Sequence, residues 1–291
     1  MRSITILTLG IALLFLAASP VTQAAQPGST AQTQPDQTAE PGEPRKISPE
    51  ALFAAMLVNA EKGQPEAMLN VGTLYEQGLG APKNFTNALQ WYEKAAFAGA
   101  AEGYFRMGGC YEIGMGAVAD MAKAVSFHEK AAAMGSPQAL HKMASLHFLG
   151  KGVPKNSAKG LDFLTQAANA GNSAAANELA FVHLKGIAGQ KEDLLKAKEW
   201  FTKSAESGNL EGIKNLAVML KHGMGQKPDP AGALRWYCIA QKGGLNAPDL
   251  ETVIADLKKS LKPTQVKKAE DEAKKWMEAY KKRAQNNAPK Q

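Results

Sequence analysis

The sequence predicts an all-α protein built as a solenoid, a linear stack of helix–loop–helix units. A pattern with a period of 36 or 37 residues occurs five times along the chain. A fixed period of this size is typical of stacked repeats. Within each period, apolar residues recur three and four places apart, which is the spacing of one face of a helix.

The second helix predicted in each repeat has a polar start and a glycine end. The start is an Asn or Asp, whose side-chain oxygen can accept an orphan backbone N–H. The end is a glycine, the residue that a left-handed C-terminal cap favours. The starts are Asn84, Asp120, Asn156, Asp193 and Asp229, and the ends are Gly99, Gly135, Gly171, Gly208 and Gly244.

The first helix predicted in each repeat carries an apolar residue, a small residue, and a bulky residue four places after the apolar one. Val71, Gly72 and Tyr75 are the first example. The i, i+4 spacing places both large side chains on one face, and the small residue lets the second helix approach. A tight glycine loop, Gly78 to Gly80 in the first repeat, joins the two helices. Since one such unit cannot bury its apolar face alone, the units are expected to share a continuous core.

This pattern resembles the Sel1-like repeat family, a longer-looped relative of the tetratricopeptide repeat. The resemblance covers about residues 65–245 and rests on two motifs, Leu74-Tyr75-Glu76-x-Gly78-x-Gly80 and Ala88-x-x-Trp91-Tyr92-x-Lys94-Ala95-Ala96-x-x-Gly99. It implies a right-handed α–α superhelix of about five repeats with capping helices. It also implies a protein-binding module with no chemistry or cofactor of its own.

The N-terminal residues predict export. A positive residue, Arg2, precedes an apolar stretch that is short for a membrane span, and small residues lead to Ala24. These features indicate a signal peptide over residues 1–24, cleaved near Ala24, and so a periplasmic or secreted protein. An uncleaved anchor is the alternative. The polar, proline-containing residues 25–47 predict a disordered linker.

The remaining boundaries follow from the repeat register. Ser48 and Pro49 have the residue types of a helix N-cap and first turn, which predicts an N-terminal capping helix over residues 48–64. The five repeats are expected at residues 65–100, 101–136, 137–172, 173–209 and 210–245. Capping helices and a basic tail are expected over residues 246–291.

The net charge of +7 is concentrated at the C-terminus. Residues 258–291 hold 11 Lys and Arg against four Asp and Glu, whereas residues 25–257 hold 22 against 23. A nearly neutral solenoid argues against nucleic-acid binding, which requires a basic face. An apolar stripe that includes Trp276 predicts that the tail caps the last repeat. Contact of its lysines with an anionic membrane surface is the alternative.

The sequence offers no catalytic or metal-binding constellation. Cys110 and Cys238 lie in the second and fifth repeats, too far apart for the roughly 7 Å that a disulfide requires. His147 and His183 occupy the position of Tyr75 in successive repeats, and we interpret them as aromatic substitutes rather than as a metal pair. An envelope enzyme, such as a peptidoglycan or β-lactam hydrolase, is an alternative for which no motif is found.

By the resemblance, the first helices line a concave surface that binds the partner. The side chains expected there run from an acidic end at Glu66, Glu76, Glu102 and Glu112 through an apolar middle to a basic end. Exposed apolar clusters rimmed by charge indicate interaction sites, although part of this set could instead pack against the neighbouring unit. The candidate binding residues are Phe105, Ile113, His141, Phe148, Leu149, Phe181, Leu184, Lys185, Lys214 and Lys221.

Overall fold

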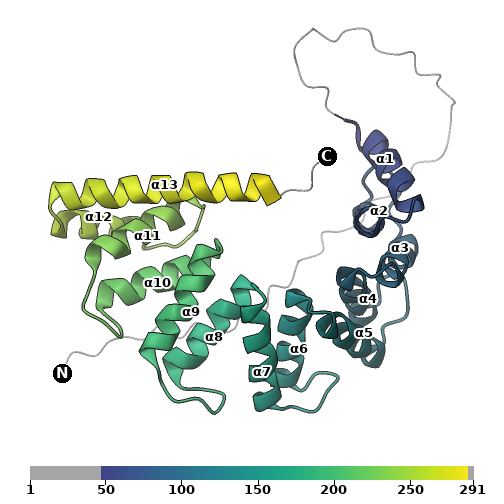
Figure 1. The fold of residues 1–291 in the computed structure, drawn as a ribbon, viewed down its shortest axis with the longest axis horizontal. Coiled ribbons are helices and arrows are strands. Elements are labelled where there is room, and N and C mark those ends of the chain that lie inside the picture. Colours follow the sequence, from purple (N-terminus) through teal and green to yellow (C-terminus); the bar gives the residue numbers. More distant parts are fainter. Residues whose placement is uncertain (1–46, 288–291) are drawn as a thin grey trace, which may run out of the picture. The chain divides into compact units, whose positions relative to one another are not determined.

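A computed structural model describes residues 47–287, which form 13 helices and, within that range, no strand (Figure 1). The predicted all-α repeat fold is confirmed. The predicted signal peptide, nearly all of the predicted linker and the last four residues lie outside the described residues.

The helices form five hairpins with terminal helices at both ends, each helix from α1 to α11 packs against the next in the chain, and α13 packs against α11. Helix α1 (Pro49–Glu61) comes first and α12 (Leu250–Ser260) and α13 (Pro263–Asn287) come last. The hairpins are α2 (Pro65–Gln77) with α3 (Phe85–Phe97), α4 (Ala101–Ile113) with α5 (Met121–Ala133), α6 (Pro137–Leu149) with α7 (Ser157–Asn169), α8 (Ser173–Lys185) with α9 (Leu194–Glu206), and α10 (Leu210–His222) with α11 (Pro230–Lys242).

The predicted caps bound the second helix of every hairpin. Asn84 Oδ1 accepts the backbone N–H of Asn87 at 3.0 Å, and the other four Asn or Asp starts do the same within their own units. The five terminal glycines all have φ between +81° and +92°. Only glycine adopts this region without a steric penalty, so these positions fix where each second helix ends.

The small residue of each first helix sets the distance between the two helices of a hairpin. A Cβ on Gly72 would lie 2.5 Å from the ring of Tyr92, and one on Gly108 would lie 2.5 Å from the ring of His128. No real side chain tolerates such an approach. Glycine at these two positions therefore lets a large ring of the second helix lie directly on the first.

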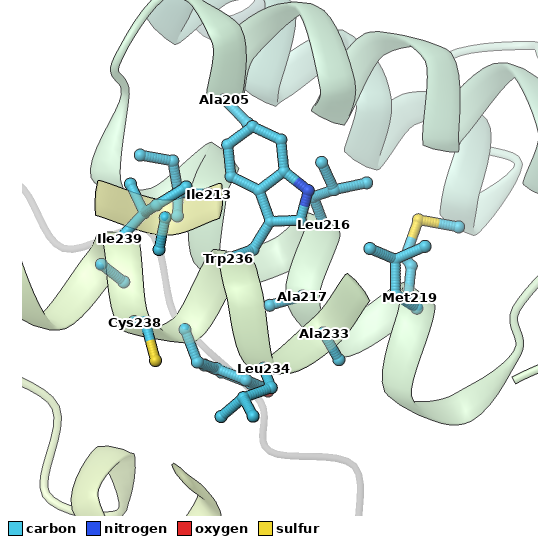
Figure 2. Packing of buried hydrophobic residues seen from close by; sticks show 14 of the residues in the cluster. Ala205, Ile213, Leu216, Ala217, Met219, Ala233, Leu234, Trp236, Cys238 and Ile239 are labelled. Carbon is cyan, nitrogen blue, oxygen red and sulfur yellow. The ribbon is translucent and has the colours of Figure 1, made fainter. Parts of the chain in front are cut away.

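The core continues from one hairpin into the next. To the cluster that contains Trp236, for example, α11 also contributes Leu234 and Ile239, and α10 contributes Ile213 and Leu216 (Figure 2). The same cluster extends to buried residues of α8, α9, α12 and α13. Each unit thus completes the apolar environment of its neighbours.

Helix α13 covers α11 at the C-terminal end of the stack. Ala269 and Ala273 are buried, and Trp276 meets Trp236 edge-on with ring centroids 5.7 Å apart. Tyr280 stacks on Trp276 and donates to the carbonyl of Ser207 at the end of α9, at 3.4 Å. The predicted apolar stripe therefore packs onto the last hairpin, and most lysines of α13 remain exposed.

Two glycine substitutions with opposite expected signs test this assignment of the backbone. Gly135 has φ +81° with open space around the position of a Cβ, so Gly135→Ala adds only conformational strain. It should lower the free energy of unfolding by about 1 kcal/mol. Gly109 lies inside α4, also with open space, so Gly109→Ala should raise that free energy by about 0.5–1 kcal/mol. Chemical denaturation measures both, and shifts of the same sign would contradict the assigned conformations.

Two neighbouring substitutions on α13 test its packing. Ala273→Asp places a carboxylate where the side chain is completely buried, which should destabilise the C-terminal end by about 2 kcal/mol or more. Lys274 is exposed, so Lys274→Asp should change stability by about 0.5 kcal/mol at most. Thermal unfolding followed by circular dichroism compares the two variants. Equal melting temperatures would mean that α13 does not pack as described.

Candidate functional site

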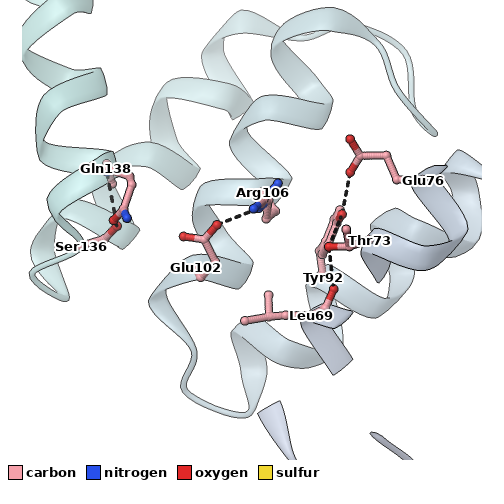
Figure 3. A network of polar contacts seen from close by, with 9 residues as sticks. Leu69, Thr73, Glu76, Tyr92, Glu102, Arg106, Ser136 and Gln138 are labelled. Carbon is pink, nitrogen blue, oxygen red and sulfur yellow. Dashed lines mark hydrogen bonds and ion pairs between the residues drawn. The ribbon is translucent and has the colours of Figure 1, made fainter. Parts of the chain in front are cut away.

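The surface formed by the first helices begins with a buried tyrosine that bridges the first hairpin. Tyr92 of α3 lies against Gly72 of α2, and its hydroxyl donates to Glu76 Oε2 at 2.6 Å (Figure 3). The hydroxyl of Thr73 lies 3.4 Å from the hydroxyl oxygen of Tyr92 and itself donates to the carbonyl of Leu69. Burial, and then the hydrogen bond to Glu76, raise the pKa of Tyr92. This tyrosine therefore stays a neutral donor.

The second hairpin has a histidine in the same position. His128 of α5 lies against Gly108 and is buried, 1% exposed, with no hydrogen-bond partner for either ring nitrogen among the described residues. Its Nε2 lies 3.8 Å from Glu112 Oε2. Burial first, and then the positive charge of Lys142, lower the pKa of His128 to about 4. The imidazole is consequently neutral at pH 7.

Glu112 joins the second and third hairpins. Its carboxylate is only 9% exposed and lies 2.6 Å from Lys142 Nζ of α6 and 2.7 Å from Lys151 Nζ of the loop between α6 and α7. Burial alone would raise the pKa of Glu112, but the two lysine hydrogen bonds hold it below the usual range. An ionised pair of this kind fixes the two hairpins to each other, because a carboxylate left without partners here would be costly.

Further polar contacts connect the first helices of later units. His141 Nε2 of α6 lies 3.0 Å from Glu178 Oε1 of α8. Asn215 Nδ2 of α10 donates to Asn177 Oδ1 of α8 at 3.0 Å. Much of the charge that the sequence predicts for the binding surface is therefore already paired within the protein.

The aromatic residues predicted to bind a partner make internal contacts. A Cβ on Gly160 would lie 2.8 Å from the ring of Phe148, so that ring occupies space left by a glycine. Phe181 meets Phe201 edge-on at 5.1 Å, and Phe105 lies 5.4 Å from His128. These three side chains are partly buried, as are His141, Leu184, Lys214 and Lys221.

Three predicted residues extend into solvent. Ile113 and Leu149 are each 66% exposed at the last positions of α4 and α6, and Lys185 is exposed at the last position of α8. Two further aliphatic side chains, Leu79 at 46% and Ile187 at 52%, lie exposed just after α2 and α8. We call these four residues, Leu79, Ile113, Leu149 and Ile187, the apolar edge.

The apolar edge contributes one exposed aliphatic side chain from each of four successive hairpins, at the last position of the first helix in two of them and in the following loop in the other two. Sequence reasoning found Ile113 and Leu149 but missed Leu79 and Ile187. The signal was present, because both missed residues directly follow the glycine that ends the first helix.

A cavity of about 420 Å³ lies between α9, α10, α11 and α13. Its wall includes Trp236 and Arg235, and Arg235 Nη1 lies 3.6 Å from Glu272 Oε2. The buried Nε of Arg235 has no partner among the described residues. Sequence reasoning missed this cavity, because it exists only through the packing of α13 across the last hairpin.

The remaining candidates occupy structural positions. His147 is buried and stacks on Phe163 at 5.5 Å, as expected of an aromatic substitute. Cys110 and Cys238 are buried free thiols, and burial raises both pKa values, that of Cys110 to about 11. Over residues 47–287 there is no cluster of three or more metal-ligating side chains. In the same range no helix has the length and apolarity to cross a bilayer.

The described residues therefore define an α-solenoid with polar contacts between its units. The chain belongs to the Sel1 repeat family, because the model of the Sel1 repeat matches residues 65–99, 101–136, 137–172, 173–209 and 211–244, together more than half of the chain. A search of curated protein sequences finds no relative.

Two solved structures are similar to this chain, and the first shares its fold. A Sel1 repeat protein from Oxalobacter formigenes is 29% identical, with 80% of this chain and 94% of that chain covered and a TM-score of 0.63. The protein c5321, a protective antigen of uropathogenic Escherichia coli with an SLR fold, is 19% identical. It has 84% and 68% coverage and a TM-score of 0.48.

The buried histidine gives the protein a predictable response to acid. The folded state keeps His128 neutral down to about pH 4, whereas the unfolded chain binds a proton below about pH 6.5. The stabilisation is therefore complete above pH 6.5 and is lost as the pH falls toward 4, by roughly 1–3 kcal/mol. His128→Tyr, which copies Tyr92, should flatten the pH dependence of the free energy of unfolding in this window.

The control is His222→Tyr, at an exposed histidine on α10. It should leave the pH profile of the parent protein unchanged. A profile that is equally steep for His128→Tyr and the parent protein would show that another group is responsible.

Proposed function

We propose that this protein is an exported, non-catalytic scaffold that binds a protein or peptide partner along the apolar edge and the adjoining faces of the first helices. One observation carries the proposal. Ile113 and Leu149 stand two-thirds exposed at equivalent positions of consecutive hairpins, while the neighbouring aromatic side chains are occupied by internal contacts.

The energetics favour these residues as anchors. Full burial of a leucine or isoleucine side chain is worth about 1.5–3 kcal/mol, and much of that gain is still available at Ile113 and Leu149. They need no rearrangement of the core to reach a partner. A few such anchors usually provide most of the binding free energy of an interface.

The polar surroundings give direction to such an interface. Glu112 directly precedes Ile113 and Lys151 lies two residues after Leu149, and these two charges neutralise each other. Lys185 lies at the equivalent position of the next hairpin and is exposed. A partner segment with aliphatic side chains followed by an acidic group would therefore match this surface. The nearly neutral charge of the repeats favours a protein partner over nucleic acid.

Partner capture from native envelope extracts tests the proposal. Ile113→Asp combined with Leu149→Asp should reduce capture at least tenfold. Binding would then have to desolvate two carboxylates instead of burying two aliphatic side chains. Both side chains are exposed, so the melting temperature should stay nearly constant. The matched control is Val118→Asp, which introduces the same charge at a residue that is 89% exposed in the loop after α4.

Unchanged capture by the double variant would refute the apolar edge as the binding surface. Loss of capture only in the Lys274→Glu, Lys275→Glu variant would move the contact to the lysine-rich face of α13. Phe148→Ala is a useful comparison, because the ring fills the space over Gly160 and its loss should lower stability as well.

A further inference from the structure

Helix α1 has no polar face. Its 13 residues include only two charged side chains, Glu50 and Glu61. One side, with Phe53, Met56 and Leu57, packs on α2, the one helix of residues 47–287 that contacts α1 extensively. The opposite side exposes Ala51, Leu52, Ala54, Ala55 and Val58, with Leu52 at 38% and Val58 at 50%.

The repeat register explains this unpartnered face. Gly63, with φ +87°, precedes Gly99 by one period, so α1 stands in the position of a second helix. In the complete hairpins a second helix packs against its own first helix and against the first helix of the next unit. The first helix belonging to α1 would fall at residues 29–41, which contain no Val, Ile, Leu, Met or aromatic residue.

A helix that is apolar on all sides is normally buried on all sides. The sequence of residues 29–41 offers no large apolar side chain for covering α1, which favours a covering surface from another molecule. Its shape is constrained, because the exposed side of α1 is one helix long and lined by small alanines between two aliphatic side chains.

We propose that α1 is a homodimer contact in which it packs against α1 of a second copy. Two identical chains could pair α1 with α1 or α1 with α13, and the composition of the two ends of the stack favours the first. At the C-terminal end α13 covers α11, and its outer side exposes Lys267, Lys274 and Lys275. A head-to-tail contact would press the apolar face of α1 onto these charges. Pairing α1 with itself is isologous and closes at two copies.

The sequence of α1 is self-complementary in an antiparallel pair centred on Ala55. Counting along the helix, Leu52 then lies opposite Val58 of the partner subunit, on both sides of the axis. The alanines at the centre allow the close interaxial distances of about 8 Å seen for small residues. Lys62, just after the helix, comes near Glu50 of the partner subunit, and Glu61 lies beside it, so each end of the pair holds one positive and two negative charges.

Cysteine crosslinking of the full-length chain tests the pairing directly. Both native cysteines are buried, so Ala55→Cys introduces the one readily accessible thiol of the described residues. Copper phenanthroline in air should oxidise two such thiols to a disulfide and convert most of the protein to a covalent dimer. Val118→Cys, at a more exposed loop residue, is the control and should give at least tenfold less dimer.

A second measurement uses the unmodified protein. An interface one helix long is small compared with a standard stable interface. Sedimentation should therefore show a monomer–dimer equilibrium over about 1–100 µM. Val58→Asp should abolish the dimer and should also block crosslinking in the Ala55→Cys background. If Val58→Asp unfolds α1, Val58→Asn provides the same comparison without a charge.

Two results would overturn the proposal. The first is a monomer at every concentration, with Ala55→Cys crosslinking no better than Val118→Cys. The second is a monomer that binds vesicles of phosphatidylglycerol and phosphatidylethanolamine and loses that binding in Val58→Asp, which would assign the face to a membrane surface. Both results can be told apart from a failure of the proposed partner binding, whose main anchors Ile113 and Leu149 lie on α4 and α6.

Discussion

The structure depends on one constraint, that no hairpin of this protein can bury its apolar surface alone. Each second helix is only 13 residues long and needs an apolar neighbour on two sides. Stacking satisfies this need for every internal unit and leaves it open at the two ends. At the C-terminus, Ala273 and Trp276 of α13 close the stack. At the N-terminus, α1 keeps an exposed apolar face, and this asymmetry is the basis of the dimer that we propose.

The same hairpin position carries different chemistry in successive units, and this variation decides which side chains are free. Tyr92 bridges to Glu76, whereas His128 lies beside Glu112, whose charge is neutralised by Lys142 and Lys151. In the third hairpin the position of Glu76 and Glu112 is occupied by Phe148, which packs over Gly160. Charges and rings on the surface of the first helices therefore serve mainly to join units, and the aliphatic side chains that we propose to bind a partner are left exposed.

In the function that we propose, this division of roles separates the residues that bind a partner from those that hold the fold. The caps, the small residues and the buried rings fix the geometry of each hairpin, and none of them is itself a residue of the apolar edge. Ile113 and Leu149 are exposed and contribute little to the core. Substitutions of Ile113 or Leu149 should change partner binding at small cost to stability. Substitutions of His128 or Phe148 should also lower the stability of the fold.

The sequence by itself determined the repeat, the helix boundaries and the caps, because these depend on local rules. Asn84 caps α3, and Gly99 adopts a positive φ, as the spacing of such residues predicts. It did not determine which predicted binding side chains are available, because Phe148 and Phe181 are occupied by rings and glycines of other helices. The pairing of Glu112 with Lys142 and Lys151, across 30 and 39 residues, was likewise decided only by the tertiary structure. Period and cap residues act within a few positions of the chain, whereas exposure and ion pairing depend on how neighbouring units stack.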